Sequence, residues 1–175
     1  YLFYVVFAIL AGEFTIQEHL PFHVCRFVAI ATPYFIWKNN RFWLGVFYFW
    51  ILAGTLNANI TPDIRYGFPS WDYFAYWIIH SFLIIVPIYL VIVLKFTVTI
   101  KDLLYALLMA NVFLLFSLCV NYILGSNYMY TLAKPPAATL LDHMGPWPWY
   151  LVTSQGLALL LFFLAYLPFL FIIVL

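Results

Sequence analysis

Residues 18–26 bring together a carboxylate, two imidazoles, a thiol and a guanidinium at the start of an apolar segment. Ionisable side chains at membrane depth are costly, so a cluster of them indicates a functional site. Within this stretch Cys25 is the candidate nucleophile, because a thiol attacks a carbonyl group once a neighbouring base has taken its proton. The chain is therefore expected to be organised around this stretch.

The imidazole that best matches Cys25 in position is that of His80. Counted from the outer ends of their expected helices at about 1.5 Å per residue, Cys25 lies about 8 Å deep and His80 about 10 Å deep. Equal depth makes a Cys–His pair possible. Two alternatives stay open. In the first, Cys25 is a small buried apolar residue and His80 makes a hydrogen bond to a neighbouring helix. In the second, Cys25 forms a disulfide with Cys119, which lies about 9 Å deep.

A second group of side chains suits the headgroup of a phospholipid. His19, His23 and Arg26 follow one another at spacings of four and three residues, which on a helix places them on one face. A planar guanidinium binds a phosphate through two parallel hydrogen bonds. Asp63 and Asp142 lie in loops expected on the same side, so we predict that they complete a headgroup site. An ion pair between Arg26 and a nearby carboxylate is the structural alternative.

Zinc binding is a further interpretation of the same stretch. Glu18, His19, His23 and Cys25 all have side chains of the types that bind zinc. No Cys-x-x-Cys or His-Glu-x-x-His pattern accompanies them. The sequence therefore predicts neither a metal site nor another cofactor.

Four polar residues are predicted to support the nucleophile. Asn57 and Asn121 are expected within about 6 Å of the outer ends of their helices. Ser126 and Asn127 follow Gly125, which is expected to end a helix. Donors of these types stabilise the oxyanion of a tetrahedral intermediate. A capped turn at the membrane interface is the alternative for Ser126 and Asn127.

The composition defines the solvent of the chain. Of the 175 residues, 67% are hydrophobic, 23% aromatic and 7% charged. A soluble domain has about a quarter of its residues charged, so a lipid bilayer must surround this one. The net charge of +1 provides no basic patch for phosphates, which excludes a nucleic-acid partner and leaves membrane lipids as the expected partners. No feature of the sequence indicates an oligomeric state.

Apolar segments of suitable length predict an all-α polytopic bundle. A membrane-spanning helix needs about 20 mostly apolar residues. Both ends of the chain lie within apolar runs, so we expect a single transmembrane domain, residues 1–175, from a somewhat longer chain and with its first helix truncated. About six helices are expected, at residues 1–12, 20–37, 42–59, 73–94, 103–125 and 146–175.

The Lys and Arg residues of the loops predict the orientation. Cytoplasmic loops carry the excess of positive charge. Both chain ends are therefore placed toward the cytoplasm and the candidate site toward the outer leaflet. The residues expected on the inner side are Lys38, Arg41, Lys95 and Lys101, and those on the outer side are Arg65 and Lys134.

Several longer motifs resemble a known family. They include His19-Leu-Pro-Phe-His-Val-Cys25-Arg26, Gly125-Ser-Asn-Tyr-Met-Tyr130 and Gly145-Pro-Trp-Pro-Trp-Tyr150, in that order along the chain. In these motifs the chain is similar to the YwaF-like conserved integral membrane proteins of bacteria, which implies a bacterial plasma membrane.

That family is similar in turn to an animal transmembrane acyltransferase, which moves an arachidonoyl group from phosphatidylcholine to a lyso ether phosphatidylethanolamine. The animal enzyme uses a Cys near the start of one membrane helix and a His on a later one. More distantly, the family resembles the androgen-induced membrane hydrolases, which use Thr and His on lipid esters. Carried over by motif, Cys25 matches the nucleophile and His80 the base. The acyl specificity is not implied for a bacterial-type chain.

The residues and the resemblance together predict a membrane-embedded, thiol-dependent enzyme that uses Cys25 and His80. It would be a phospholipid acyltransferase or transacylase, or a lipid ester hydrolase. One alternative is a non-enzymatic transporter or scaffold subunit that binds a lipid or solute in its polar cavity. A second alternative is a metal- or haem-binding membrane protein.

Overall fold

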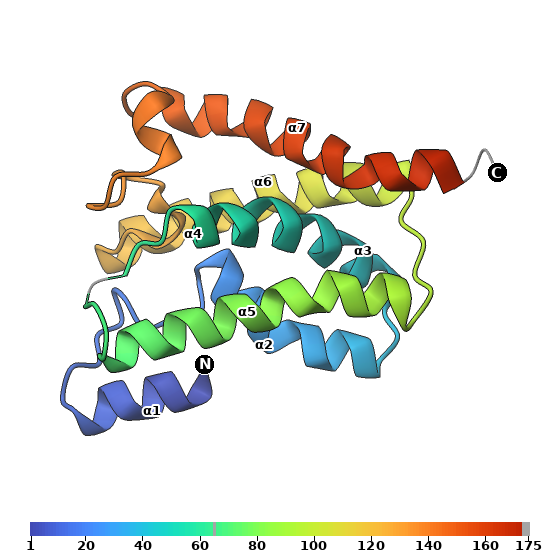
Figure 1. Ribbon diagram of the computed structural model, residues 1–175. Helices are drawn as coiled ribbons and strands as arrows, with labels where there is room; N and C mark the ends of the chain where they lie inside the picture. Colours follow the sequence, from blue (N-terminus) through green and yellow to red (C-terminus); the bar gives the residue numbers. More distant parts are fainter. Residues whose placement is uncertain (65, 173–175) are drawn as a thin grey trace.

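Every regular element is a helix in residues 1–64 and 66–172, which the computed structural model describes (Figure 1). This confirms the predicted all-α class. Arg65, which contributed to the predicted orientation, lies outside the described residues. The helices are α1 (Leu2–Leu10), α2 (Val24–Trp37), α3 (Arg41–Trp50), α4 (Leu56–Ile60), α5 (Trp71–Ile92), α6 (Ile100–Leu124) and α7 (Trp149–Ile172). The shorter elements are the π-helix η1 (Ile51–Thr55), which joins α3 to α4, and the 3-10 helices η2 (Tyr128–Tyr130) and η3 (Leu140–His143).

Within the described ranges, four helices are long and apolar enough to cross a membrane, namely Arg41–Ile60, α5, α6 and the Trp149–Leu170 part of α7. The apolar helix α2 is shorter, and α1 has 9 residues. Helices thus occur at each predicted place, but α2 begins at Val24 instead of residue 20, because turns precede it. The predicted stop of α6 at Gly125 is confirmed, since this residue is left-handed with φ 62°.

Helix α3 lies at the centre of the bundle, because it is apolar on almost every side. All its residues from Leu44 to Trp50 are buried. They form one cluster with Val28 of α2, Leu83 of α5 and Phe162 of α7. The Trp50 indole N–H donates to a backbone carbonyl of α6 at 2.9 Å, which satisfies the one polar atom of this large side chain.

A buried carboxylate fixes the end of the bundle that carries the short connections. Asp102 caps α6 together with Thr99 and receives two bonds from the Arg41 guanidinium, at 2.9 and 2.7 Å. Gly45 makes room for this pair, since a Cβ atom there would lie 2.6 Å from the Asp102 Oδ1 atom. The capping box also explains why α6 begins at Ile100, ahead of the predicted residue 103.

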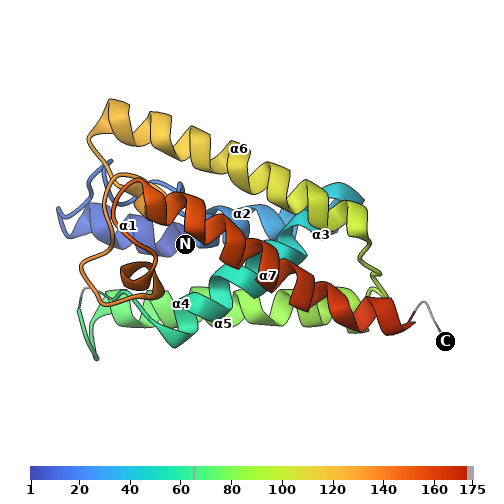
Figure 2. The same ribbon diagram turned by 90° about the horizontal axis from the view of Figure 1, so that it is seen from above.

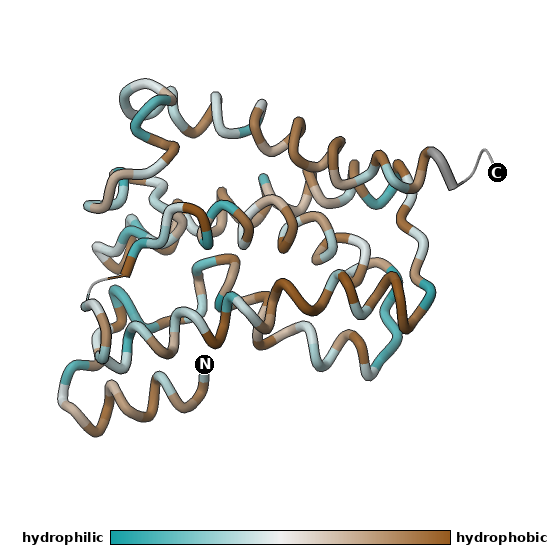
Figure 3. The backbone as a smooth tube through the Cα atoms, in the orientation of Figure 1, coloured by the Kyte–Doolittle hydropathy of each residue, from teal (hydrophilic) through white to brown (hydrophobic). Residues whose placement is uncertain are grey.

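The three long connections gather at the opposite end, on the left of Figure 1. They are residues 11–23, residues 61–64 and 66–70, and residues 125–148. Seen from above, α7 crosses the bundle between α6 and α5 (Figure 2). Hydrophilic residues concentrate at the two ends, whereas the helices between them are largely hydrophobic (Figure 3). The long connections therefore form an open, polar end above an apolar helical bundle.

Candidate active site

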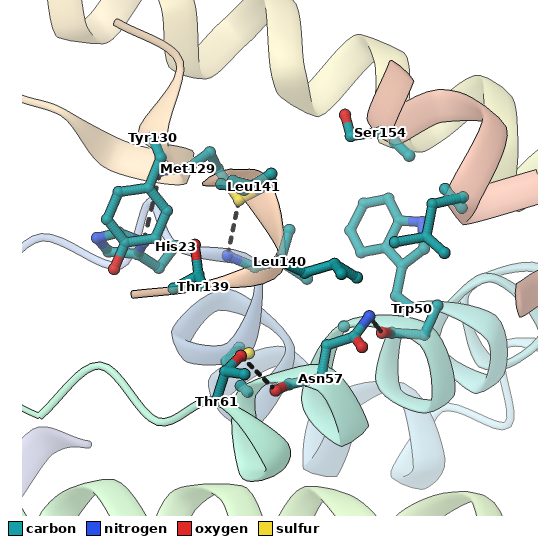
Figure 4. A pocket seen from close by; sticks show the side chains of 18 of the residues that line it. His23, Trp50, Asn57, Thr61, Met129, Tyr130, Thr139, Leu140, Leu141 and Ser154 are labelled. Atoms are coloured by element: carbon teal, nitrogen blue, oxygen red, sulfur yellow. Dashed lines mark hydrogen bonds between the residues drawn. The ribbon is translucent and has the colours of Figure 1, made fainter. Parts of the chain in front are cut away.

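Two cavities meet at the start of α2. The apolar cavity, of about 490 Å³, lies between η1, α6 and α7 and is lined mainly by apolar residues such as Trp50, Leu157 and Phe162 (Figure 4). The polar cavity, of about 990 Å³, is lined by the segment before α2, the start of α5 and the loops of the open end. The residues that line both cavities are His23, Cys25, Arg26, Asp63, Tyr76, His80 and Tyr130.

Cys25 is the second residue of α2 and follows the N-cap residue His23. Its thiol is free and half-buried, and so is available for chemistry. Cys119 is also a free thiol, exposed on α6, so the predicted alternative of a disulfide is wrong. The N-terminus of a helix carries partial positive charge, which favours negative charge developing beside Cys25.

His80 is buried on α5, and one of its ring nitrogens is used in a hydrogen bond to the backbone. Its Nδ1 atom lies 2.8 Å from the carbonyl oxygen of Tyr76, and the two rings stack with centroids 4.0 Å apart. A carbonyl only accepts, so Nδ1 carries the proton and Nε2 keeps its lone pair. His80 is thereby held in the tautomer that a general base needs.

The segment before α2 is not helical, so the prediction that His19, His23 and Arg26 share one helix face is wrong. Residues Thr15–His19 form a turn closed by the His19 N–H to the Thr15 carbonyl at 3.0 Å. Pro21 offers no N–H for a first helical turn and disfavours helical backbone at the residue before it. His19 is buried against Tyr4 and lines only the polar cavity.

His23 and Arg26 both line the junction of the cavities, but His23 is the N-cap residue of α2 whereas Arg26 lies within this helix. The His23 Nδ1 atom accepts from the Met129 N–H at 3.4 Å. Burial, helped by the Arg26 charge, lowers the pKa of His23 to about 3, so this imidazole is neutral. Arg26 donates to the Glu18 carbonyl and lies over the Tyr4 ring, 5.2 Å from its centroid. An arginine held in this way carries its charge into both cavities.

The loop after α6 is organised by Asn121, which lines neither cavity. Its amide donates to the Tyr128 carbonyl and the Thr131 hydroxyl, both at 2.7 Å, and accepts from Ser126 and the Tyr128 N–H. Both amide hydrogens are therefore occupied. Asn121 positions the loop and has no free N–H for the predicted contact with an oxyanion.

The other predicted polar residues divide between the cavities. Ser126 and Asn127 line the polar cavity, where Asn127 also caps the backbone of Leu132 and Ala133. Asn57 lines the apolar cavity, and its amide donates to the Ala53 carbonyl at 2.9 Å. One amide hydrogen of Asn57 is left for a ligand.

Met129 and Tyr130 close the junction from above (Figure 4). Both have left-handed backbone, with φ 60° and 54°, which costs about 1–2 kcal/mol for each such residue. The Met129 sulfur accepts from the Val24 N–H at 3.4 Å and so caps α2. The Tyr130 hydroxyl donates to Asp63 at 2.6 Å. Burial and this carboxylate raise the pKa of Tyr130.

Asp142 lies apart from the junction. It is the third residue of η3, accepts from the Thr139 N–H at 2.8 Å and lines neither cavity. The structure thus brings Cys25, His80, His23, Arg26 and Asp63 together and leaves Asp142 outside. Among the described residues, no group of three or more His, Cys, Asp or Glu side chains is arranged to hold a metal ion.

The sequence prediction missed three residues that contact the side chains of the junction. Tyr76 fixes the tautomer of His80, Tyr130 holds Asp63, and the Thr55 hydroxyl lies 4.0 Å from the Cys25 sulfur. The one available signal was the Gly-Thr pair that interrupts the apolar run at residues 54–55.

Comparison with known proteins identifies the family. The model of the TMEM164 family matches residues 1–166. The chain belongs to the TMEM164 family. The YwaF-like assignment made from short motifs is therefore wrong, and the expectation of a bacterial plasma membrane, which came with that assignment, loses its support. No curated protein and no solved structure matches the chain. With long apolar helices such as α5 and α6, this member of the TMEM164 family is an integral membrane protein.

Proposed function

We propose that this protein transfers acyl groups between membrane lipids through a thioester on Cys25. The observation that carries the proposal is the position of Cys25 and His80 in the wall of both cavities. A glycerophospholipid has the same two parts, an apolar chain and a polar headgroup, with an ester between them. A lipid that fills both cavities places its ester beside the thiol and the imidazole.

In the acylation half of the reaction, His80 takes one proton from Cys25 and gives it to the leaving group. His80 Nε2 takes the Cys25 proton, and the sulfur attacks the acyl carbonyl to give a tetrahedral oxyanion. The carbon–oxygen bond of the ester then breaks, and the leaving lyso-lipid oxygen receives the proton from the imidazolium. The hydroxyl of a second lyso-lipid attacks the thioester in the same way, and Cys25 is regenerated as a thiol.

Transfer is favoured over hydrolysis by the surroundings of the thioester. The acyl chain would occupy the apolar cavity, whose lining excludes water from that side of the carbonyl. The amide hydrogen of Asn57 that is not used by Ala53 is the candidate donor to the oxyanion. On the polar side, Arg26 would meet the phosphate, and His23 and Asp63 the rest of the headgroup.

The test uses purified protein in nanodiscs, with a donor phospholipid that carries a labelled acyl chain and an unlabelled lysophospholipid acceptor. We expect Cys25→Ala to abolish transfer and the acyl adduct seen by intact-protein mass spectrometry. His80→Gln should slow transfer by about 10²–10⁴-fold. Cys119→Ala is the matched control, because this free thiol lies outside both cavities. Full transfer by Cys25→Ala would refute the proposal.

The open end is proposed to face away from the cytoplasm. The short connections at the other end carry Lys38, Lys95 and the Arg41 of α3, and positive charge marks the cytoplasmic side. In sealed vesicles of known orientation, a membrane-impermeant amine reagent should modify Lys134 from outside and Lys38 only after permeabilisation. The reverse pattern would place the site on the cytoplasmic side.

A further inference from the structure

The π-helix η1 presents the Thr55 hydroxyl to the candidate nucleophile. Thr55 exposes 1% of its surface, and its Oγ1 atom lies 4.0 Å from the Cys25 sulfur. Among the described residues, the Thr55 hydroxyl and the Cys25 sulfur are hydrogen-bond partners of each other. The two side chains come from α2 and from η1 and lie 30 residues apart in sequence.

The Thr55 hydroxyl is used differently from those of Thr61 and Thr153. A helical threonine ordinarily donates to the carbonyl four residues earlier. Thr61 does so toward Asn57 at 3.1 Å, as Figure 4 shows, and Thr153 does so toward Trp149 at 3.2 Å. Thr55 instead sits at the end of the π-helix, where the wider turn directs its hydroxyl across to α2.

The wider turn is held by its own neighbours. A π-helix shifts the backbone bonds, and such insertions are frequent at functional sites. The Asn57 amide donates to the Ala53 carbonyl and the Asn59 amide to the Thr55 carbonyl, both at 2.9 Å. At Gly54 a Cβ atom would meet nothing within 4 Å, so the turn opens onto the apolar cavity.

We propose that Thr55 is a positioning residue for Cys25, a role that rests on the proposed function. A hydroxyl is both donor and acceptor and can rotate between the two. It accepts from the thiol in the resting protein and donates to the sulfur once the proton has passed to His80. It donates again when the thioester breaks and the sulfur leaves. The hydroxyl thus orients the sulfur and stabilises its charged form, without exchanging a proton of its own.

Alkylation of Cys25 by N-ethylmaleimide tests this role without any lipid substrate. The measurement uses Cys119→Ala protein, so that Cys25 is the one thiol in the chain. We expect Thr55→Val to lower the alkylation rate at neutral pH by about three- to tenfold, because the long hydrogen bond between the hydroxyl and the sulfur, at 4.0 Å, is lost. Thr55→Ser should retain the rate within twofold. The lipid transfer rate should fall in Thr55→Val in parallel.

Thr32→Val is the matched control. Thr32 is completely buried on α2, its hydroxyl has no hydrogen-bond partner among the residues that the structure describes, and it lines neither cavity. Its replacement should leave the alkylation rate unchanged. If Thr55→Val fails to fold, Thr55→Ser and Thr55→Ala carry the same test, since they differ by one hydroxyl. Equal rates in the variants with and without the hydroxyl would overturn the role of Thr55. Dependence on the hydroxyl without any lipid transfer would keep that role and overturn the proposed function.

Discussion

Replacing Ala158 by Leu should shorten the acyl chains that the protein accepts. Ala158 lies on α7 and lines the apolar cavity, together with Leu157 and Phe162. The added side chain projects into space that the proposed function assigns to the acyl chain. Chains long enough to reach this part of the cavity would have to give up the volume that the leucine occupies.

The size of the effect follows from the number of carbon atoms. Leucine has three more carbons than alanine, and each methylene withdrawn from water contributes about 0.8 kcal/mol. Donors with the longest chains should therefore lose about 2.4 kcal/mol of binding, which is about a 50-fold reduction in relative rate. Donors shorter by three or more carbons should react as with the unchanged protein.

The assay is a competition among donor phospholipids whose acyl chains differ stepwise in length, with transferred chains counted by mass spectrometry. Gly156→Leu is the control, because Gly156 is exposed on the same helix and lines neither cavity. Its chain-length profile should match that of the unchanged protein. An identical profile for folded Ala158→Leu would show that the apolar cavity does not hold the acyl chain.

Three further predictions concern the scaffold. Gly45→Ala should destabilise the protein by about 1–3 kcal/mol, since the added Cβ atom would lie 2.6 Å from the Asp102 carboxylate. The melting temperature in detergent measures this loss. In the control variant Gly156→Ala the added Cβ atom meets nothing within 4 Å, so its melting temperature should not fall. In the folded protein the pKa of His23 is lowered to about 3, whereas the pKa of histidine in the unfolded chain is about 6.5. Between these two pH values the unfolded chain binds more protons than the folded protein. Stability should therefore fall as the pH falls from about 6.5 toward 3, by at most about 1.4 kcal/mol per pH unit. His23→Gln should flatten this decline, and a melting temperature as steeply dependent on pH in the variant would contradict the argument. Asn121→Ala should cost at least about 2 kcal/mol, because the Tyr128 N–H and carbonyl lose buried partners, and undiminished stability would show that the loop repacks.

Features that depend on neighbouring residues could be predicted from the sequence. Hydropathy over successive residues predicted the all-α bundle and the place of each helix, since a helix in lipid satisfies its own backbone. Gly125 predicted the end of α6, because glycine adopts left-handed backbone at little cost. Residue type and predicted depth selected Cys25 and His80, which do line the same cavities.

The family was not predicted correctly from short motifs. Short motifs around His19 and Gly145 resembled the YwaF-like proteins, whereas the match over residues 1–166 is to the TMEM164 family. The motifs are short even though they occur along nearly the whole chain, so related families that share them are not separated. The match over most of the chain decided the family.

Only the tertiary structure decided how the junction of the cavities is built. The Tyr128 hydroxyl accepts from the Leu20 N–H at 2.9 Å and donates to the Ile16 carbonyl at 2.7 Å, which keeps residues 13–23 out of a helix. Thr55 meets Cys25 only because a π-helix turns it toward α2. Spacing along a chain specifies which residues share a local element. Contacts between distant segments depend on how whole helices pack, and this packing placed the Asn121 amide against Tyr128 and the Thr55 hydroxyl beside the Cys25 sulfur.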